Sequence, residues 1–296
     1  MSGQNFHCGS IAIVGRPNVG KSTLLNHLVG QKVSITSSKA QTTRHRITGI
    51  LTEADTQYLF IDTPGFQKAH LNALNRILNR TVASTANDAN VVVFAVEAMR
   101  YTDADAAVLK SLPTGTRVIL AVTKIDREKE KARLLPFLAD MQNLFAFAAV
   151  VPVSVKNAAT LVELKRAIRP LLPVQAALFA AEELTDKSER FLAAEFIREK
   201  VFRQLGDELP YSVNVVVEQF VIEGTMRRIH ATIIVEKSSQ KAIIIGEKGE
   251  RLKRIGTDAR KEMEATFGNK VYLELWVRIK KGWADDEAMV KQYGYQ

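Results

Sequence analysis

Eight residues near the amino terminus have the spacing of a phosphate-binding loop. Gly15 is followed, after four residues, by Gly20, Lys21 and Ser22, and the apolar run 11–14 precedes them. Glycines allow successive backbone N–H groups to point at phosphate oxygens, and the helix that follows adds its positive N-terminal end. Lys21 can reach the β- and γ-phosphates, and the hydroxyl of Ser22 can ligate Mg²⁺. The sequence therefore predicts binding of a nucleoside triphosphate by Gly15, Arg16, Pro17, Asn18, Val19, Gly20, Lys21, Ser22 and Thr23.

A second polar run follows the predicted strand 57–61 and consists of Asp62, Thr63, Pro64 and Gly65. By itself such a run is typical of a surface turn. At the carboxyl end of a strand beside a phosphate-binding loop, however, an aspartate is placed to hold Mg²⁺. The backbone N–H of Gly65 can turn toward a γ-phosphate. We therefore expect this run, together with Phe66, to contact the nucleotide.

Two later loops indicate which base is bound. The loop after the buried strand 118–122 consists of Thr123, Lys124, Ile125 and Asp126. The carboxylate of Asp126 can accept hydrogen bonds from the ring N–H and the exocyclic amine of guanine, which adenine does not offer, so such a site rejects adenine. The aliphatic part of Lys124 can cover the base. A backbone N–H near the guanine O6 is expected from the loop Ser154, Val155 and Lys156.

The segments between these motifs alternate between apolar strands and helical stretches. We predict strands at 46–51, 57–61, 91–96, 118–122 and 147–153, and helices at 103–112, 129–144 and 161–172. Residues 31–46 are expected to form a loop that a ligand orders. The alternation predicts an α/β domain, a mostly parallel sheet flanked by helices, with its ligands at the carboxyl ends of the strands.

The four motifs, in this order, resemble the GTPase fold of the translation-factor-related class. The resemblance implies that GTP and GDP are the ligands, and that a threonine of the loop 31–46, Thr42 or Thr43, closes on Mg²⁺ and the γ-phosphate. It implies Mg²⁺ ligation by Ser22, Thr42 and Asp62, and contributions to hydrolysis by Lys21, Thr42, Thr43, Gly65 and Asn18. The guanine motif of this class usually begins with asparagine. Thr123 stands there in this chain, so we expect guanine specificity with slightly looser binding.

Two residues bear on the rate of hydrolysis. Ras-type proteins place a glutamine after the aspartate motif to orient the attacking water, and this chain has Phe66 there, which predicts slow intrinsic hydrolysis. Asn18 resembles the asparagine of GTPases that bind K⁺ against the phosphates. We therefore hypothesise that Asn18 helps to hold K⁺ and that K⁺ raises turnover.

The second half of the chain follows a segment, 173–187, that we interpret as a linker containing a helical run at 175–184. Beyond it we predict a helix at 189–205, strands at 213–222 and 229–235, a short helix at 240–245, a helix at 251–267 and a strand at 271–279. Gly246 and Gly249 lie in the loop between the predicted helices 240–245 and 251–267. Their missing side chains would let a nucleic-acid backbone approach the protein backbone closely.

The run 243–255 and the order of these elements resemble a type II KH domain, an α+β module that grips about four single-stranded nucleotides. The residues that we expect to contact RNA are Ile244, Gly246, Glu247, Lys248, Gly249, Arg251 and Leu252. For Lys253 and Arg260, a solvated helix face is the favoured interpretation.

A GTPase domain followed by a type II KH domain resembles the Era family of bacterial ribosome-assembly GTPases. The matching division is a GTPase domain at 1–172, the linker 173–187, and a KH domain with a C-terminal tail at 188–296. The resemblance implies binding near the 3′ end of 16S rRNA in the 30S subunit, control of that binding by GTP, and loose association with the inner membrane. We expect a monomer.

The composition agrees with a polyanion partner without identifying it, because Lys and Arg exceed Asp and Glu by 41 to 32, a net charge of +9. The single cysteine, Cys8, leaves no intramolecular disulfide and indicates a reducing compartment. No apolar run reaches the ~18 residues that a membrane span requires. We therefore expect a cytoplasmic protein, with peripheral membrane association permitted by its charge.

Two alternatives belong to other functional classes. One is a GTPase of tRNA modification, which would require a catalytic cysteine or a folate-type domain, and the sequence shows neither. The other is a regulatory protein that acts at the membrane, for which hydrolysis would be incidental.

Overall fold

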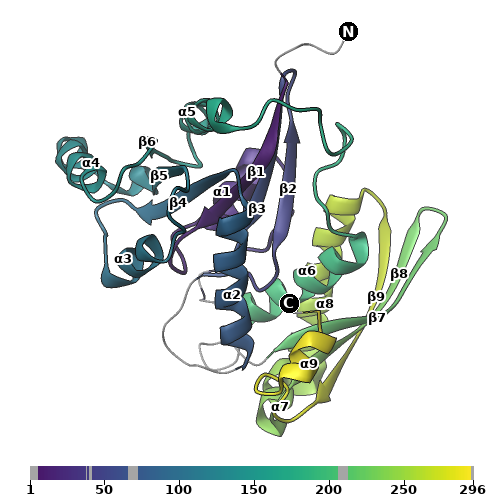
Figure 1. Ribbon diagram of the computed structural model, residues 1–296. Helices are drawn as coiled ribbons and strands as arrows, with labels where there is room; N and C mark the ends of the chain where they lie inside the picture. The colour runs from purple at the N-terminus through teal and green to yellow at the C-terminus, as the bar shows by residue number, and fades with distance from the viewer. Residues whose placement is uncertain (1–5, 38, 40–41, 66–72, 206–212, 295–296) are drawn as a thin grey trace. The chain divides into compact units, whose positions relative to one another are not determined.

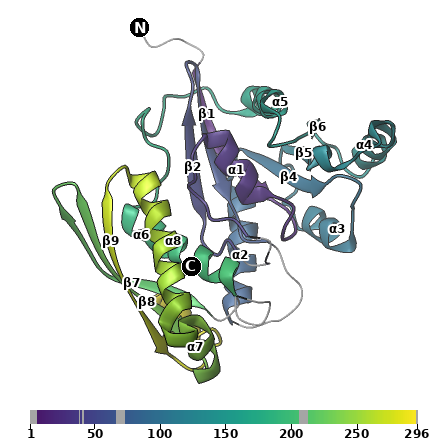
Figure 2. The same ribbon diagram turned by 180° about the vertical axis from the view of Figure 1, so that it is seen from behind.

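The computed structural model describes residues 6–37, 39, 42–65, 73–205 and 213–294 (Figures 1 and 2). Within these residues the chain divides into two compact units. The first contains the described residues within 6–34, 43–65 and 78–186, and the second contains those within 35–42, 73–77 and 187–294. Residues 35–42, in the predicted mobile loop, therefore group with the second unit, although both flanking segments belong to the first.

The first unit is built on a six-stranded sheet with the strand order β2-β3-β1-β4-β5-β6. Its strands are β1 (His7–Val14), β2 (Ile47–Thr52), β3 (Thr56–Asp62), β4 (Val91–Glu97), β5 (Val118–Thr123) and β6 (Ala149–Pro152). All neighbouring pairs are parallel except β2 and β3, which form an antiparallel hairpin. This arrangement confirms the predicted α/β class with its mostly parallel sheet.

Helices cover both faces of this sheet. Ile11 and Ile13 pack with α1 (Lys21–Val29) and α5 (Ala158–Ile168) on one face. Ala12 and Val14 point to the other face, where they pack with part of α2 (Ala73–Asp88) and with α3 (Asp103–Lys110) and α4 (Leu134–Gln142). Burial on both faces explains why β1 and β4 are almost continuously apolar.

Local signals set the ends of these helices. Gly20 and Gly30 flank α1 in the left-handed region, with φ of 104° and 81°. Thr102 and Asp105 form a capping box at the start of α3, and the side chain of Asn157 accepts from Ala159 N at the start of α5. These starts follow the ends of strands, so they place the polar loops at the carboxyl edge of the sheet.

The helical run that we expected at 175–184 is absent. Instead, His7 pairs with Val174 and Gly49 with Thr185 in isolated bridges, and bends and a turn lie between these two points. The side chain of Gln57 accepts hydrogen bonds from Leu178 N and Phe179 N, at 2.8 and 3.0 Å. These long-range hydrogen bonds satisfy backbone N–H groups that would otherwise donate within a helix. They therefore outweigh the helical preference of the small residues in this segment.

The second unit contains a three-stranded sheet in the order β7-β8-β9, formed by β7 (Asn214–Glu223), β8 (Met226–Val235) and β9 (Lys270–Ile279). β7 and β8 are antiparallel, whereas β8 and β9 are parallel. One face of the sheet packs on α6 (Glu189–Gln204) and α8 (Glu250–Phe267), with Phe196, Ile233 and Ile255 fully buried between them. This is the α+β arrangement predicted for a type II KH domain.

Four further elements complete the second unit or differ from expectation. α7 (Ser238–Ile245) and the 3₁₀ turn η5 (Glu247–Gly249) precede α8, as predicted for the Gly-x-x-Gly region. α2 and α9 (Glu287–Gln292) were not anticipated from the sequence. Among the described residues, no helix is both long enough and apolar enough to cross a lipid bilayer.

Candidate functional site

The phosphate-binding loop joins β1 to α1 and depends on backbone conformations that favour glycine. Gly15 and Gly20 have φ of 154° and 104°, and Asn18 also lies in the left-handed region, at 65°. A Cβ on Gly15 would lie 2.5 Å from the carbonyl oxygen of Ala95, so no larger residue fits there without a shift. The loop residues predicted from the sequence therefore form one continuous turn between a strand and a helix.

Lys21 is turned back onto this loop. Its Nζ donates to the carbonyl oxygens of Gly15 and Arg16, at 2.9 and 3.1 Å, and the residue is 7% exposed. Burial lowers the pKa of Lys21 to about 8, although the nearby charge of Asp62 raises it in part. The ammonium is thus held inside the loop that would receive phosphate oxygens.

Hydroxyl groups from three segments converge on Asp62, at the end of β3. Its Oδ2 accepts from Ser22 Oγ at 2.6 Å, Ser34 Oγ at 2.8 Å and Thr43 Oγ1 at 3.0 Å. Burial raises the pKa of Asp62, while these hydroxyls and Lys21 lower it. Its other oxygen, Oδ1, is buried and has no hydrogen-bond partner among the residues that the structure describes. An oxygen-only set with one unpartnered carboxylate oxygen fits a Mg²⁺ ion, which prefers oxygen ligands.

The structure distinguishes the two threonines that the sequence left open. Thr43 lies against both Asp62 and Ser22, with 2.8 Å between Thr43 Oγ1 and Ser22 Oγ. Thr42, which we expected among the metal ligands, lies elsewhere. Its hydroxyl donates to Lys39 O at 2.7 Å, and its carbonyl oxygen accepts from Arg198 Nη2 at 2.6 Å. Ser34 joins Asp62 without having been predicted.

The rest of the aspartate motif is fixed by close contacts. The hydroxyl of Thr63 donates to Ile13 O at 2.8 Å, which ties the end of β3 to β1. A Cβ on Gly65 would lie within 2.9 to 3.1 Å of Pro17 atoms, so this position accepts only glycine without a local shift. Pro64 lies between these residues in the described chain, whereas Phe66 and Gln67 fall outside the described residues.

The two base-recognition loops meet as predicted. Asp126 Oδ1 accepts from Ser154 Oγ at 2.9 Å, and Lys156 Nζ lies 3.0 Å from Asp126 Oδ2. Hydrogen bonds from Lys156 and Ser154 hold the pKa of Asp126 below its ordinary value, so the side chain is a carboxylate that can accept hydrogen bonds. A cavity of about 190 Å³ lies here, lined by Val19, Gly20, Thr23, Leu24, Thr123, Lys124, Asp126, Arg127, Val153, Val155 and Lys156.

Thr123 performs a tethering role despite replacing the usual asparagine. Its Oγ1 lies 2.7 Å from the carbonyl oxygen of Val19, in the phosphate-binding loop, and 3.1 Å from that of Val96. Lys124, with φ of 59°, donates from Nζ to Asn18 O at 2.6 Å. Ile125 then begins a 3₁₀ turn, Ile125–Arg127. The guanine motif is therefore joined to the phosphate-binding loop by two side chains.

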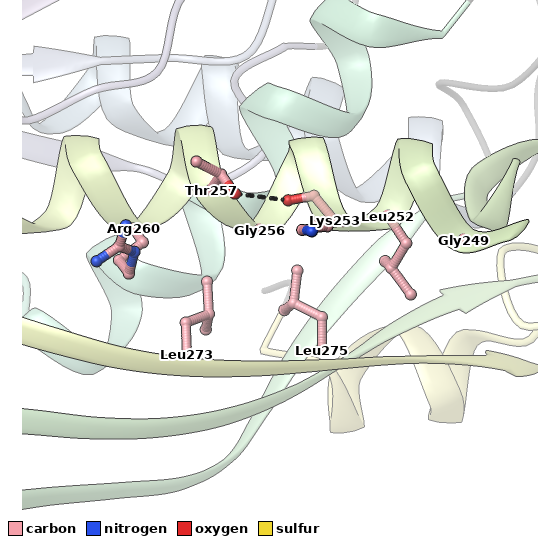
Figure 3. A pocket seen from close by; sticks show the side chains of 8 residues that line it. All are labelled: Gly249, Leu252, Lys253, Gly256, Thr257, Arg260, Leu273 and Leu275. Atoms are coloured by element: carbon pink, nitrogen blue, oxygen red, sulfur yellow. Dashed lines mark hydrogen bonds between the residues drawn. The ribbon is translucent and has the colours of Figure 1, made fainter.

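In the second unit, a groove of about 380 Å³ runs between α8 and β9 (Figure 3). Leu252, Leu273 and Leu275 face its interior and form an apolar floor. Lys253 and Arg260 also line it, so the favoured interpretation of these two as a purely solvated helix face is incomplete. The remaining lining residues are Gly249, Gly256 and Thr257.

The Gly-x-x-Gly turn lies at one end of this groove. Gly246 and Gly249 have φ of 73° and 81°, and Lys248, at 48°, is also left-handed. Lys248 and Glu247 are exposed, and Arg251 donates from Nη1 to Ile243 O at 2.5 Å. Ile244 is fully buried in the core of the unit, so our expectation that it contacts RNA is wrong.

Comparisons with known proteins cover the whole chain. The pattern of the family described as "50S ribosome-binding GTPase" matches residues 10–124, and that of the "KH domain" matches residues 208–284. GTPase Era of Nitrosomonas eutropha is 55% identical over 296 residues, which is all of both chains. GTPase Era of Neisseria meningitidis serogroup B is 54% identical over 291 residues, 98% of this chain and 95% of the relative.

Two solved structures are similar over nearly the same length. One is Aquifex aeolicus Era, in a variant form bound to GDP and AlF4⁻, and the other is Era in complex with MgGDPNP and nucleotides 1506–1542 of 16S ribosomal RNA. Each has a TM-score of 0.94 and 36% sequence identity, and each comparison covers 98% of this chain and 99% of the solved chain.

Lys21 should make nucleotide affinity depend on pH. Its pKa is about 8 in the nucleotide-free protein, and the negative charge of bound phosphates raises it. Binding therefore takes up a proton once the pH passes 8, so affinity is constant below about pH 7 and then falls by up to about tenfold per pH unit. Calorimetric titration with GDP and Mg²⁺ at about pH 7, 8 and 9 measures this slope.

The matched control is Lys21→Arg, which retains a cation that does not titrate in this range. Its slope, rather than its absolute affinity, is compared with that of the natural protein, because ionisation of guanine affects both. Equal slopes in the two proteins would contradict the assignment to Lys21.

Proposed function

Because this chain belongs to the GTPase Era family of GTP-hydrolysing enzymes, we propose that it is a GTP-controlled switch that binds 16S rRNA near its 3′ end and acts in assembly of the 30S ribosomal subunit. The observation that carries this proposal is the presence, in one chain, of a complete guanine nucleotide site and a KH-type groove. A solved Era with both MgGDPNP and 16S rRNA nucleotides matches the chain almost end to end.

In this proposal the first unit binds GTP through the residues predicted from the sequence. Lys21 and the backbone of residues 15–23 hold the phosphates, and Asp126 with the loop 154–156 recognises guanine. Ser22, Asp62 and Thr43 would hold Mg²⁺, which supplies electrostatic stabilisation of the phosphates. The backbone N–H of Gly65 would donate to the γ-phosphate, and Thr43 would bind Mg²⁺ beside that phosphate.

Hydrolysis is proposed to be slow without a further cation. The position that carries a water-orienting glutamine in Ras-type proteins is Phe66 here. Asn18 lies in the phosphate-binding loop with left-handed φ, where its side chain is proposed to help hold K⁺. The positive charge of K⁺ would then take part of the role of an arginine finger.

The second unit is proposed to bind single-stranded RNA in the groove between α8 and β9. Bases would lie over Leu252, Leu273 and Leu275, and the phosphate backbone would pass Gly246, Glu247, Lys248 and Gly249, where the two glycines carry no side chain. Lys253, Arg260 and Arg251 add positive charge along the same edge. Ile244 supports the turn from within the core.

The setting proposed for this switch is a monomer in the cytoplasm that binds the 30S subunit, with peripheral association at the inner face of the plasma membrane. A role purely at the membrane, or in tRNA modification, has less support, because full-length relatives are named GTPase Era. Sedimentation with 30S subunits against flotation with lipid vesicles, in GTP and in GDP, separates a ribosomal role from a membrane role.

The choice between Thr43 and Thr42 as the Mg²⁺ ligand has a direct test. Thr43→Ala removes a hydroxyl from the set on Asp62, so the Mg²⁺ concentration required for binding of a non-hydrolysable GTP analogue should rise by about tenfold or more. Thr42→Ala makes the same chemical change one residue away and should leave this requirement nearly unchanged. A larger effect from Thr42→Ala would reverse the assignment.

RNA binding is tested at Lys248. A Cβ on Gly246 would lie 2.7 Å from Arg251 Cβ, so replacing that glycine disturbs the fold itself. Lys248 is exposed, and aspartate tolerates its left-handed conformation. Lys248→Asp should weaken binding of an oligonucleotide from the 3′ end of 16S rRNA by about tenfold or more at low salt.

Lys281→Asp provides the control for Lys248→Asp. It makes the same change of charge at an exposed residue of the same unit that belongs neither to the Gly-x-x-Gly turn nor to the groove lining. The two variants should retain the same GTP affinity. Equal loss of RNA affinity in both would indicate a general charge effect and would contradict the groove as the site.

The cation hypothesis predicts faster turnover in potassium than in sodium. Because K⁺ would be held at Asn18 against the phosphates, GTP hydrolysis should rise several-fold, on the order of 1 kcal/mol in the barrier, when KCl replaces NaCl at equal ionic strength. The release of phosphate under single-turnover conditions is the measurement. Equal rates in the two salts would remove K⁺ from the mechanism.

A further inference from the structure

Two carboxylates beside the nucleotide site were not singled out by any motif. Glu97 is the last residue of β4, and Asp105 lies in the first turn of α3. Asp105 is fully buried, and the side chain of Glu97 is 16% exposed. Buried or nearly buried carboxylates require partners, and the partners of these two come from the loops that bind GTP. We refer to Glu97 and Asp105 as the carboxylate clamp.

The first partner is Arg16, in the phosphate-binding loop. Its Nε lies 3.0 Å from Asp105 Oδ2, and its Nη2 lies 3.3 Å from Glu97 Oε2. Arg16 is 8% exposed, so its guanidinium is engaged by the carboxylate clamp while its backbone remains part of the loop. Asp105 Oδ2 also accepts from Thr102 N and Oγ1, at 3.0 and 2.7 Å, which fixes the carboxylate at the start of α3.

The second partner is Lys124, in the base-recognition loop. Its Nζ lies 3.1 Å from Glu97 Oε1 and donates to Asn18 O at 2.6 Å. Lys124 has φ of 59°, a conformation that costs free energy for a residue other than glycine and therefore needs contacts that hold it. Glu97 supplies one such contact, and the other reaches back to the phosphate-binding loop.

Of the two carboxylates in the clamp, Glu97 is therefore the one that contacts both cations. Partial burial raises its pKa, but the ammonium of Lys124 and the guanidinium of Arg16 outweigh this effect and hold the pKa of Glu97 below its ordinary value. Arg127 also contacts Glu97 Oε1, at 3.4 Å, but its side chain is 69% exposed, so solvent screens this pair.

We propose that Glu97 is a positioning residue for guanine nucleotide binding: its carboxylate ties Arg16 of the phosphate-binding loop to Lys124 of the base-recognition loop, so that both loops are ordered before GTP or GDP arrives. A preordered site pays less conformational entropy on binding. Because the tie touches neither the γ-phosphate nor the metal ligands, it should strengthen GTP and GDP binding alike. Uniform binding of this kind lowers KM and leaves kcat unchanged.

The test is Glu97→Gln in the full chain, a change that keeps the shape of the side chain and removes its charge. The Kd for GTP and GDP should rise by the same factor, about tenfold to a hundredfold, because a hydrogen-bonded charge pair is lost. Dissociation of fluorescent GDP should accelerate correspondingly. The kcat at saturating GTP should stay within about twofold of the natural value.

Glu163→Gln is the matched control, since it removes the same charge from the same unit at an exposed residue paired with Arg166. It should change none of these quantities. Unchanged Kd values in Glu97→Gln would overturn the proposal. A fall in kcat with KM unchanged would also overturn it, because Glu97 would then act in the chemical step rather than in positioning.

A double-mutant cycle keeps the proposal testable if Glu97→Gln lowers stability. Arg16→Gln removes the other half of the tie, so adding Glu97→Gln to it should weaken nucleotide binding less than Glu97→Gln does alone. Additive effects would show that the two side chains act independently and would contradict the tie. Glu97→Asp, which retains the charge on a shorter side chain, should lie between the natural protein and Glu97→Gln in GDP dissociation rate.

Discussion

A buried carboxylate organises the nucleotide-binding end of the first unit. Asp62 is fully buried, and hydroxyls from Ser22, Ser34 and Thr43 converge on one of its oxygens. A charge in such a place is tolerated only when donors surround it. Ser22 lies at the start of α1, and Ser34 and Thr43 lie near the two ends of the predicted loop 31–46. The carboxylate of Asp62 therefore holds together segments that are separate in the sequence. Its unpartnered second oxygen leaves this cluster incomplete without a cation.

The proposed phosphate-binding sites of the two units differ in their chemistry. The first unit concentrates charge and N–H groups in a tight turn, where glycine is required by contacts such as the one between Gly15 and Ala95 O. The second unit instead removes side chains at Gly246 and Gly249 and sets an apolar floor beside them. The first arrangement suits a compact triphosphate with a metal ion, whereas the second suits an extended chain whose bases need an apolar surface.

Most of the fold, and the loops that carry the motifs, could be predicted from the sequence. Strands, glycine turns and helices each have a local sequence pattern. Prediction from the sequence failed where distant contacts decide. The helix expected at 175–184 does not form, because Leu178 N and Phe179 N donate to the side chain of Gln57, more than 100 residues earlier. Ile244 was assigned to the RNA surface although its side chain lies in the core. Glu97, Asp105 and Ser34 carry no recognisable motif, since their importance arises only from what the folded chain brings beside them.

The hydrogen bonds of Lys21 within its own loop affect how strongly the loop can bind phosphate. Its ammonium donates to the carbonyl oxygens of Gly15 and Arg16. The phosphate oxygens of a nucleotide must compete with these two carbonyl oxygens for the ammonium of Lys21. When the nucleotide dissociates, the ammonium can return to the carbonyl oxygens. Phosphate binding at Lys21 is therefore an exchange of hydrogen-bond acceptors rather than the gain of a new one, so the ammonium adds less to affinity than its charge alone would suggest.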